Sequence, residues 1–263
     1  MKIQSRKHIG TGGFWEVSRL CFEEAINVNF KFYKQAIFKK SLENEVINAN
    51  NKFYNPGIFE KSLDKSENLF RNLANYSLIK ESGLPTLEFY SREIVSGEEG
   101  ILGEDLNSSE KVTFVSPGNA NAALAAKEVP SFFRPQKPKI LPEAEAFLFD
   151  KKIGLIANLD ELIEKFYKDM KLTEDNKIIL SEESFFFSYS HEKCIVSYLI
   201  ADFDNIEIDV ERTDVYLNNC WQILQSFYLF ILIFAEEGSL RENYKRKILE
   251  ESKKIEKLNS DNI

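Results

Sequence analysis

Glycine residues cluster near the start of the chain, in the stretch HIGTGGFWEV at positions 8–17. Because Gly10, Gly12 and Gly13 carry no side chain, backbone N–H groups there can approach phosphate oxygens closely. Val17 follows within a stretch rich in strand-forming residues. The pattern fits a phosphate-binding loop, and it also fits an ordinary glycine-rich turn between two strands. The residues further along the chain must decide between these interpretations.

A lysine follows the glycines at a suitable distance. Lys31 ends the stretch VNFK and lies 14 residues after Val17, which leaves room for one strand, a turn and half of the next strand. An ammonium group at that position could contact phosphates held by the glycine loop. The alternative is one more solvated lysine.

Two carboxylates follow a strand-like segment much later in the chain. The stretch IADFDNI, at positions 200–206, contains Asp202 and Asp204. Carboxylate oxygens are ligands that Mg²⁺ prefers. On its own the stretch fits an acidic turn at the end of a strand as well as a metal ligand.

Taken in order, these motifs resemble those of the protein-kinase-like superfamily. The glycine stretch resembles G-x-G-x-x-G-x-V, with Gly10 and Gly12 on the first two glycines, Trp15 in place of the third and Gly13 as an extra one. VNFK resembles the V-A-I-K strand, and Asp202-Phe203 resembles the start of D-F-G, with Asp204 in place of the glycine. The resemblance implies that Lys31 holds ATP phosphates and that Asp202 ligates Mg²⁺.

The same resemblance implies three further roles. Glu67, in a helical stretch, would pair with Lys31, and Glu43, Glu45 and Glu60 are alternatives. GILGEDLN, at positions 100–107, resembles the hinge that binds adenine, which makes Glu104 a cofactor-binding candidate. Asp214 in TDVY would hydrogen-bond to the backbone of the catalytic loop from the start of a long buried helix.

The catalytic loop of the superfamily, H-R-D-x-x-x-x-N, has no clean match in the chain. One register places Ser184 at the asparagine position and Ile179 at the aspartate position, and another places Asp169 at the aspartate position. The candidates for the general base are therefore Glu183, Asp175 and Asp169.

Hydrophobic periodicity and turn residues predict the elements that must position these residues. A helix at 62–80 would present Leu69, Phe70 and Leu73 on one face and end at Gly83. The other predicted elements are strands at 8–38, a polar insertion at 39–65, two strands within 84–106, a proline-rich connection at 116–147 with a short helix at 119–127, a helix at 158–170 capped by Asn158, a hairpin at 184–206, a helix at 213–235 and a charged C-terminal helix.

This order of elements predicts an α+β fold with two lobes around a cleft. The first lobe, residues 1–103, would hold an antiparallel sheet and one main helix. The second lobe, residues 104–263, would be mostly helical with a β-hairpin.

The composition excludes some classes of protein and partner. The chain has 263 residues and a net charge of −8, which argues against general nucleic-acid binding. The apolar stretch at 216–234 contains four Asn or Gln residues, so a buried core helix is favoured over a membrane span. The three cysteines form no CxxC pair, and the N-terminus has no signal-peptide pattern. We therefore expect reduced thiols and a cytoplasmic location, with secretion into a host cell as an effector as the further option.

We expect a phosphotransferase that uses ATP and Mg²⁺, with a slight preference for a protein Ser/Thr acceptor. The resemblance is to divergent bacterial effector-type kinases or pseudokinases, and Asp204 and the GEDL hinge resemble the aminoglycoside- and choline-kinase-like branch. The alternatives are an inactive binding module that acts through a protein partner, a small-molecule kinase and an AMP transferase.

Overall fold

The structure is a computed structural model, and the described residues group by their contacts into two compact units, Met1–Tyr76 with Leu87–Ser108 and Ser77–Thr86 with Ser109–Ile263. It describes residues 2–11, 15–28, 31–41, 65–96, 98–104, 114–115, 117, 152–204 and 206–261. For residues 7–11, 15–19, 25–28, 31–41, 65–68, 91, 95, 98–99, 114–115 and 259–261 the description is of the backbone. The polar insertion after residue 41 and the proline-rich connection with its short helix, both predicted from the sequence, lie outside the described residues.

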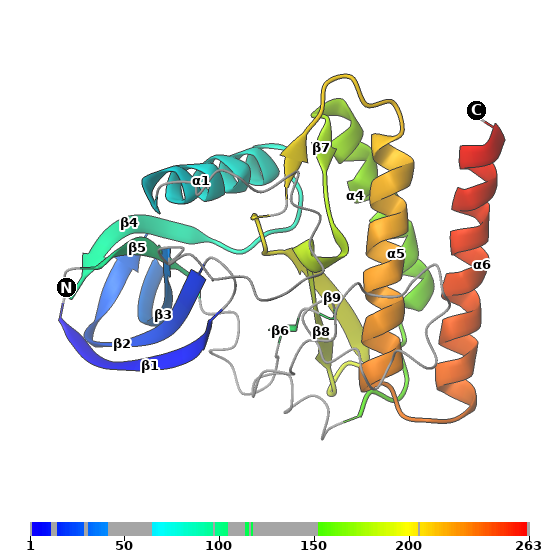
Figure 1. The fold of residues 1–263 in the computed structure, drawn as a ribbon. Coiled ribbons are helices and arrows are strands. Elements are labelled where there is room, and N and C mark those ends of the chain that lie inside the picture. The colour runs from blue at the N-terminus through cyan, green and yellow to red at the C-terminus, as the bar shows by residue number, and fades with distance from the viewer. Residues whose placement is uncertain are drawn as a thin grey trace, which may run out of the picture. The chain divides into compact units, whose positions relative to one another are not determined.

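The first unit contains a five-stranded antiparallel sheet (Figure 1). Its order is β1-β2-β3-β5-β4, and its strands are β1 (Ile3–Thr11), β2 (Trp15–Val28), β3 (Lys31–Ser41), β4 (Phe89–Val95) and β5 (Glu98–Gly103). The strands predicted around the glycine-rich stretch and within 84–106 are confirmed. β3 continues to Ser41, which is further than the predicted end at residue 38.

Helix α1 (Lys65–Glu81) lies between β3 and β4 in the chain. Its Leu69 is buried against Ile101 of β5, and Leu73 and Phe89 pack on this pair. The helix ends as the sequence predicts, because Gly83 has a φ of +76° and the Leu84 N–H donates to the Ile79 carbonyl oxygen at 3.2 Å. This is the C-terminal arrangement that glycine favours.

The second unit combines α4 (Leu159–Asp175), α5 (Val215–Phe234) and α6 (Ser239–Asp261) with short strands. The strands β8 (Phe185–Ser190) and β9 (Ile195–Ile200) form an antiparallel hairpin, as predicted, and β6 (Phe114–Val115) pairs with β8. β7 (Ile178–Ile179) pairs with β10 (Glu207–Ile208), and η3 (Glu182–Ser184) precedes the hairpin.

The core of the second unit lies around α5, which α4 and α6 contact (Figure 1). Phe166 of α4, Phe187 of β8 and Phe227 of α5 meet with ring centroids 5.4–6.2 Å apart. By length and composition α5 could cross a membrane, but 78% of its most apolar window is buried in the protein. The prediction of a core helix is therefore confirmed.

Asn158 precedes α4 as predicted, but its side chain does not cap the helix. It bonds instead to Val196 of β9, through Nδ2 to the carbonyl oxygen at 2.8 Å and through Oδ1 to the N–H at 2.9 Å. The same residue thus ties the start of α4 to the hairpin. The described residues confirm the α+β class, with antiparallel sheets and four helices.

Candidate functional sites in the two units

The glycine-rich stretch lies at the end of the β1–β2 hairpin in the first unit. Gly10 of β1 pairs with Val17 of β2, and Thr11 pairs with Glu16. Gly12 and Gly13 fall outside the described residues. The structure therefore brings together two of the four predicted cofactor-binding positions of this stretch, one on each side of the turn.

Lys31 does not lie near the glycine-rich turn. It is the first residue of β3 and pairs with Val28 at the opposite end of the β2–β3 hairpin. The residue of β3 that pairs with Val17 is Lys39. Eight residues of extended strand separate the two lysines, a distance of about 26 Å. The predicted neighbour of the glycine-rich turn is thus corrected from Lys31 to Lys39.

The strand register also assigns Lys39 to a face of the sheet. Lys39 pairs with Val17 on one side and with Ile101 of β5 on the other. Residues directly opposite each other in neighbouring strands belong to the same face. Since Ile101 is buried against Leu69 of α1, Lys39 is a residue of the face that carries the helix.

Glu67, the predicted partner of the lysine, belongs to α1. The prediction placed it one turn before Phe70 and Leu73 on an inward face, but the Phe70 side chain is 57% exposed and lies under the guanidinium of Arg92, 4.9 Å from the ring centroid. By the helical period, Glu67 falls on the side of the exposed Arg71, which is four residues later. The pairing of Glu67 stays a prediction, and Glu43, Glu45 and Glu60 lie outside the described residues.

Glu104 follows β5 and is tied to the residue that precedes β4. Its N–H donates to the Glu88 carbonyl oxygen at 2.7 Å, and the Glu88 N–H donates to the Glu104 carboxylate at 3.2 Å. The Tyr76 hydroxyl of α1 donates to the Glu88 carboxylate at 3.1 Å. These bonds fix the backbone at the end of β5, where adenine binding by Glu104 stays a prediction.

In the second unit, Asp202 lies two residues beyond the end of β9. Its Oδ1 accepts a hydrogen bond from the Asp204 N–H at 3.3 Å, and the Phe203 side chain between them is fully buried. The segment Pro85–Thr86 runs beside the end of this strand, since the Ile200 N–H donates to the Pro85 carbonyl oxygen and the Thr86 hydroxyl donates to the Ile200 carbonyl oxygen, both at 2.8 Å. These contacts fix the strand end that presents Asp202.

Glu183 and Asp202 both lie just beyond the same end of the β8–β9 hairpin. Phe185 pairs with Ile200, and the Ala201 N–H donates to the Ser184 carbonyl oxygen at 3.0 Å, one residue beyond the strands. Glu183 belongs to η3, which directly precedes β8, and Asp202 follows Ala201. Both are half-buried. One end of the hairpin therefore carries a predicted metal ligand and a predicted general base.

The connection between β7 and β8, residues 180–184, is anchored on α5. The Asn219 Oδ1 accepts a hydrogen bond from the Leu180 N–H at 2.9 Å, and the Ser226 hydroxyl donates to the Glu182 carbonyl oxygen at 2.9 Å. Two points of one helix thus position the backbone that carries Glu182 and Glu183. The H-R-D-x-x-x-x-N pattern is longer than this connection, which explains why neither register fitted.

The contact with the loop backbone predicted for Asp214 is made by Asn219 of α5. Asp214 is exposed at the start of α5, where its carboxylate accepts from the Arg212 Nε at 2.5 Å and from Nη2 at 3.2 Å. Asn219 is fully buried, and its Nδ2 donates to the Thr173 hydroxyl at 2.8 Å and to the Ile178 carbonyl oxygen at 2.7 Å. The side-chain amide of Asn219, on the second turn of α5, therefore makes the contact with the loop backbone that the sequence analysis expected from the Asp214 carboxylate.

The other two predicted bases, Asp169 and Asp175, belong to α4. Asp169 is buried, and its carboxylate accepts from the Tyr198 hydroxyl at 2.5 Å and from the Lys165 ammonium. Burial, and then the charge of Asp169, raise the pKa of Tyr198 well above its usual range, so this hydroxyl remains a donor. Asp175 is exposed at the last residue of the helix. Of the three candidates, only Glu183 lies at the end of the hairpin that carries Asp202, and which of them acts as the base stays a prediction.

Two of the residues that now define the candidate sites were missed by sequence reasoning. For Lys39 the sequence does offer a signal. In a hairpin, residues equally far from the turn pair with each other, and this rule places the partner of Val17 beyond residue 38. For Asn219, the sequence offers only a polar residue inside an apolar helix. Among the described residues, no group of three His, Cys, Asp or Glu side chains could hold a metal ion, so Asp202 is the single predicted metal ligand there.

Comparison with known proteins adds little to this description. No protein-family model matches the chain, and no curated protein matches its sequence. The chain is similar to the crystal structure of the Rio2 kinase–ADP/Mg²⁺–phosphoaspartate complex from Chaetomium thermophilum, with 12% sequence identity and a TM-score of 0.40, over 100% of this chain and 72% of that one. A likeness at this level carries no argument about the activity of the chain.

Proposed function

We propose that the chain is an ATP- and Mg²⁺-dependent phosphotransferase of the protein-kinase-like type. The observation that carries this proposal is the register of the first sheet. It pairs Lys39 of the third strand with Val17, the residue that follows the glycine-rich turn and itself pairs with Gly10. A lysine on the third strand beside a glycine-rich loop is the arrangement with which kinases hold ATP phosphates.

The second unit supports the metal part of the proposal. Asp202 follows a hairpin strand, as the metal-binding aspartate does in kinases, and the loop beside it is fixed by Asn219 and Ser226. In this chemistry the protein acts mainly by positioning the reactants and neutralising charge. Asp202 would hold Mg²⁺, which would neutralise charge on the phosphates, and Glu183 would accept the proton of the acceptor hydroxyl.

Binding of ATP to two lysine variants tests the proposal. We expect Lys39→Ala to weaken ATP binding in the presence of Mg²⁺ by about tenfold or more, since it removes a charged contact worth about 1.5–3 kcal/mol. Lys31→Ala is the matched control and should bind ATP as the wild type does. Isothermal titration calorimetry on the full chain measures both. A loss in Lys31→Ala with none in Lys39→Ala would overturn the assignment from the strand register.

The second candidate is a kinase-like binding module without turnover. The short connection at residues 180–184 favours it, because Ser184 stands where the asparagine of the catalytic loop would be. A serine hydroxyl lacks the amide oxygen that binds the second Mg²⁺ in kinases. This alternative predicts that ATP binds, with the same dependence on Lys39, while its γ-phosphate stays intact.

A further inference from the structure

The segment Glu207–Glu211 exposes apolar side chains on ordered backbone. Ile208 of β10 is 57% exposed and Val210 is 76% exposed. The three residues that alternate with them, Glu207, Asp209 and Glu211, are all acidic and all exposed. Exposed apolar side chains that are grouped on one short segment indicate an interaction surface.

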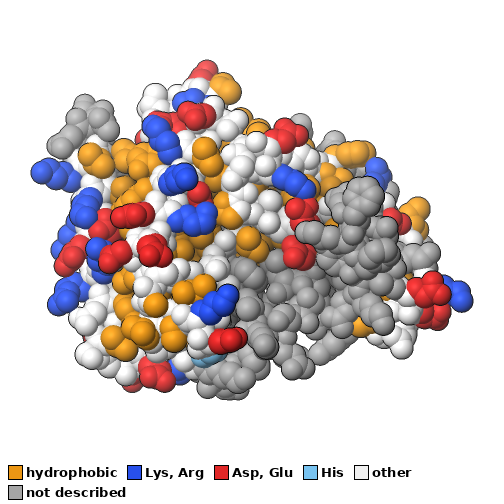
Figure 2. Space-filling model, turned by 180° about the vertical axis from the view of Figure 1, so that it is seen from behind, with side chains coloured by type: hydrophobic (Ala, Val, Ile, Leu, Met, Phe, Trp, Pro, Cys, Tyr) orange, Lys and Arg blue, Asp and Glu red, His pale blue; other side chains and the backbone are white. Residues whose placement is uncertain are grey.

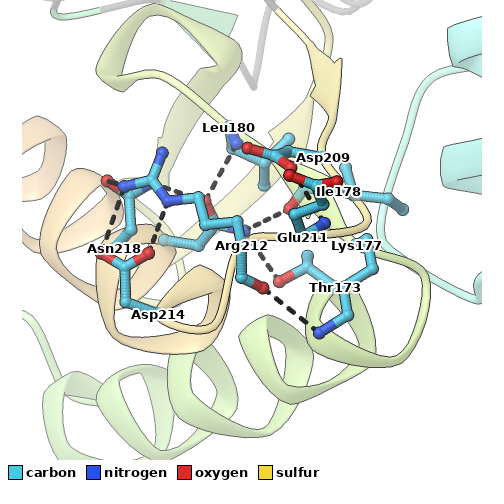
Figure 3. Close-up of polar contacts among 10 residues, drawn as sticks. Thr173, Lys177, Ile178, Leu180, Asp209, Glu211, Arg212, Asp214 and Asn218 are labelled. Atoms are coloured by element: carbon cyan, nitrogen blue, oxygen red, sulfur yellow. Dashed lines mark hydrogen bonds and ion pairs between the residues drawn. The ribbon is translucent and has the colours of Figure 1, made fainter. Parts of the chain in front are cut away.

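The backbone of this segment is held in place by the second unit (Figure 3). β10 pairs with β7, and the Asp209 N–H donates to the Lys177 carbonyl oxygen at 3.2 Å. Asp209 also accepts a hydrogen bond from the Glu211 N–H at 3.0 Å, and the Lys177 ammonium donates to the Arg212 carbonyl oxygen at 3.3 Å. The segment is therefore already ordered, so it would itself lose little conformational entropy when a partner docks there.

The open edge of the segment is short. Because Asp209 hydrogen-bonds toward β7, the N–H and C=O groups of its neighbour Ile208 point to the opposite edge, by the alternation of an antiparallel strand. β10 ends at Ile208, and the Arg212 N–H donates to the Asp209 carbonyl oxygen at 3.3 Å, so the chain turns there. In the part of the chain that the structure describes, no strand pairs with β10 on its open edge. An extended peptide can form main-chain hydrogen bonds with Ile208 on that edge, and its side chains can contact those of residues 207–211.

The charge of the segment indicates what kind of peptide fits. No lysine or arginine occurs between Asp202 and Glu211. The first cation after the segment, Arg212, is engaged by Asp214 and by the Asn218 side chain, the latter at 3.1 Å. A partner with alternating basic and apolar residues would complement both the carboxylates and the apolar side chains.

We propose that Glu207–Glu211 docks an extended basic segment of the acceptor protein. This inference rests on the proposed phosphotransferase function, whose acceptor it specifies. Glu207 is five residues from Asp202, so the docking edge lies within about 17 Å of the proposed metal ligand. A hydroxyl a few residues away from the docked segment would be within reach of that ligand.

Fluorescence anisotropy with the full chain tests the inference. The probe is a labelled peptide of alternating lysine and valine with a central serine, and a peptide with glutamate in place of each lysine is its control. The variant Glu207→Gln/Asp209→Asn/Glu211→Gln removes the charges, and its Asp209→Asn change keeps a side-chain oxygen that can accept from the backbone N–H of residue 211. The matched variant Glu161→Gln/Glu164→Gln/Glu192→Gln removes the same charge from exposed positions elsewhere.

We expect the basic peptide to bind about tenfold more weakly to the 207–211 variant, since three exposed charge pairs contribute about 1.5 kcal/mol together. The matched variant shows how much of the weakening comes from the overall loss of charge. The variant Ile208→Ser/Val210→Ser removes the apolar contacts and should also weaken peptide binding. Equal weakening by the two charge variants, or equal binding of the acidic peptide, would overturn the inference. So would loss of self-association in Ile208→Ser/Val210→Ser by analytical ultracentrifugation, which would make a second copy the occupant.

ATP binding separates failure of this inference from failure of the proposed function. All of these variants should bind ATP with Mg²⁺ as the wild type does, because none alters Lys39 or Asp202. Loss of peptide selectivity with intact ATP binding overturns the docking edge alone. Selective peptide binding in a chain that does not bind ATP overturns the acceptor role, because the phosphotransferase function on which that role rests has then failed.

Discussion

Asn219 connects three segments of the second unit through one buried side chain. It accepts from the Leu180 N–H and donates to Thr173 of α4 and to the Ile178 carbonyl oxygen of β7. Buried polar groups that lose their partner each cost about 1–3 kcal/mol. Asn219 therefore stabilises the loop that carries Glu182 and Glu183 as well as the helix on which it lies.

We predict that Asn219→Ala lowers the free energy of unfolding by about 2–4 kcal/mol, because it leaves buried groups on all three segments without their partner. Asn218→Ala is the comparison variant. The half-buried Asn218 accepts from the Arg212 Nη2 and donates to the Asn219 Oδ1, both at 3.1 Å, and its loss leaves the bonds of Asn219 to the other three groups in place. This variant should cost about 1 kcal/mol or less. Urea unfolding compares the two variants. Equal losses would show that Asn219 does not hold the loop.

The thiol of Cys220 makes stability depend on alkaline pH. Burial raises its pKa to about 12 from an ordinary value of 9.0. Above pH 9 the unfolded thiol ionises while the folded one keeps its proton, so the unfolded state binds fewer protons and the free energy of unfolding falls with rising pH. The slope for one such group approaches about 1.4 kcal/mol per pH unit.

Cys220→Ala should therefore lose stability less steeply than the wild type between about pH 8 and about pH 10. Urea unfolding at several pH values gives both slopes. Cys220 also helps to raise the pKa of Tyr216, so its removal lowers the contribution of that tyrosine in the same direction. Identical slopes would mean that the thiol of Cys220 reaches solvent in the folded state.

At the scale of elements, the β4–β5 pair shows how closely the first sheet packs. A Cβ atom on Gly103 would lie 3.0 Å from the Phe89 Cδ1 and 3.2 Å from the Glu88 carbonyl oxygen. Gly103 also directly precedes Glu104, whose backbone N–H and side chain both hydrogen-bond to the Glu88 backbone. A methyl group there must displace an aromatic ring or the strand itself.

We expect Gly103→Ala to lower the free energy of unfolding by about 1–3 kcal/mol through overpacking. Gly154→Ala is the control, because no atom lies within 4 Å of its added Cβ. That variant should be neutral or more stable by about 0.4–1 kcal/mol, since alanine restricts the unfolded chain. Thermal denaturation measures both changes, and a neutral Gly103→Ala would mean that β4 and β5 are less tightly packed than the structure has them.

The elements also show where a pattern in the sequence is sufficient and where it is not. The hairpin β8–β9 and helix α5 were predictable. Two strand-like runs around a turn indicate a hairpin, and a long apolar run indicates a buried helix. Lys31 was misplaced because the prediction put the turn earlier and Lys31 halfway along the next strand, whereas β2 continues to Val28 and Lys31 is the first residue of β3. Phe70 was predicted on the buried face of α1, but its side chain is exposed and the guanidinium of Arg92 lies over its ring.

At the scale of the whole molecule, the α+β class followed from the order of strand-like and helical stretches. The role of Asn219 did not, because only the folded chain shows which polar group of α5 meets the loop. Figure 2 shows Lys and Arg side chains interspersed with Asp and Glu on the visible face. On that face, among the described residues, no extended basic patch is visible, and the net charge of −8 points the same way. The expectation that the chain does not bind nucleic acids generally stays a prediction.

Transfer of label from ATP tests the central claim most directly. The full chain is incubated with Mg²⁺ and ATP labelled at the γ-phosphate, and in parallel at the α-phosphate, together with the basic serine peptide. The account predicts that only the γ-label reaches peptide or protein, that Asp202→Asn abolishes the transfer, and that Asp175→Asn, an exposed change at the end of α4, preserves it. Transfer of the α-label, or γ-transfer that persists in Asp202→Asn, would contradict it.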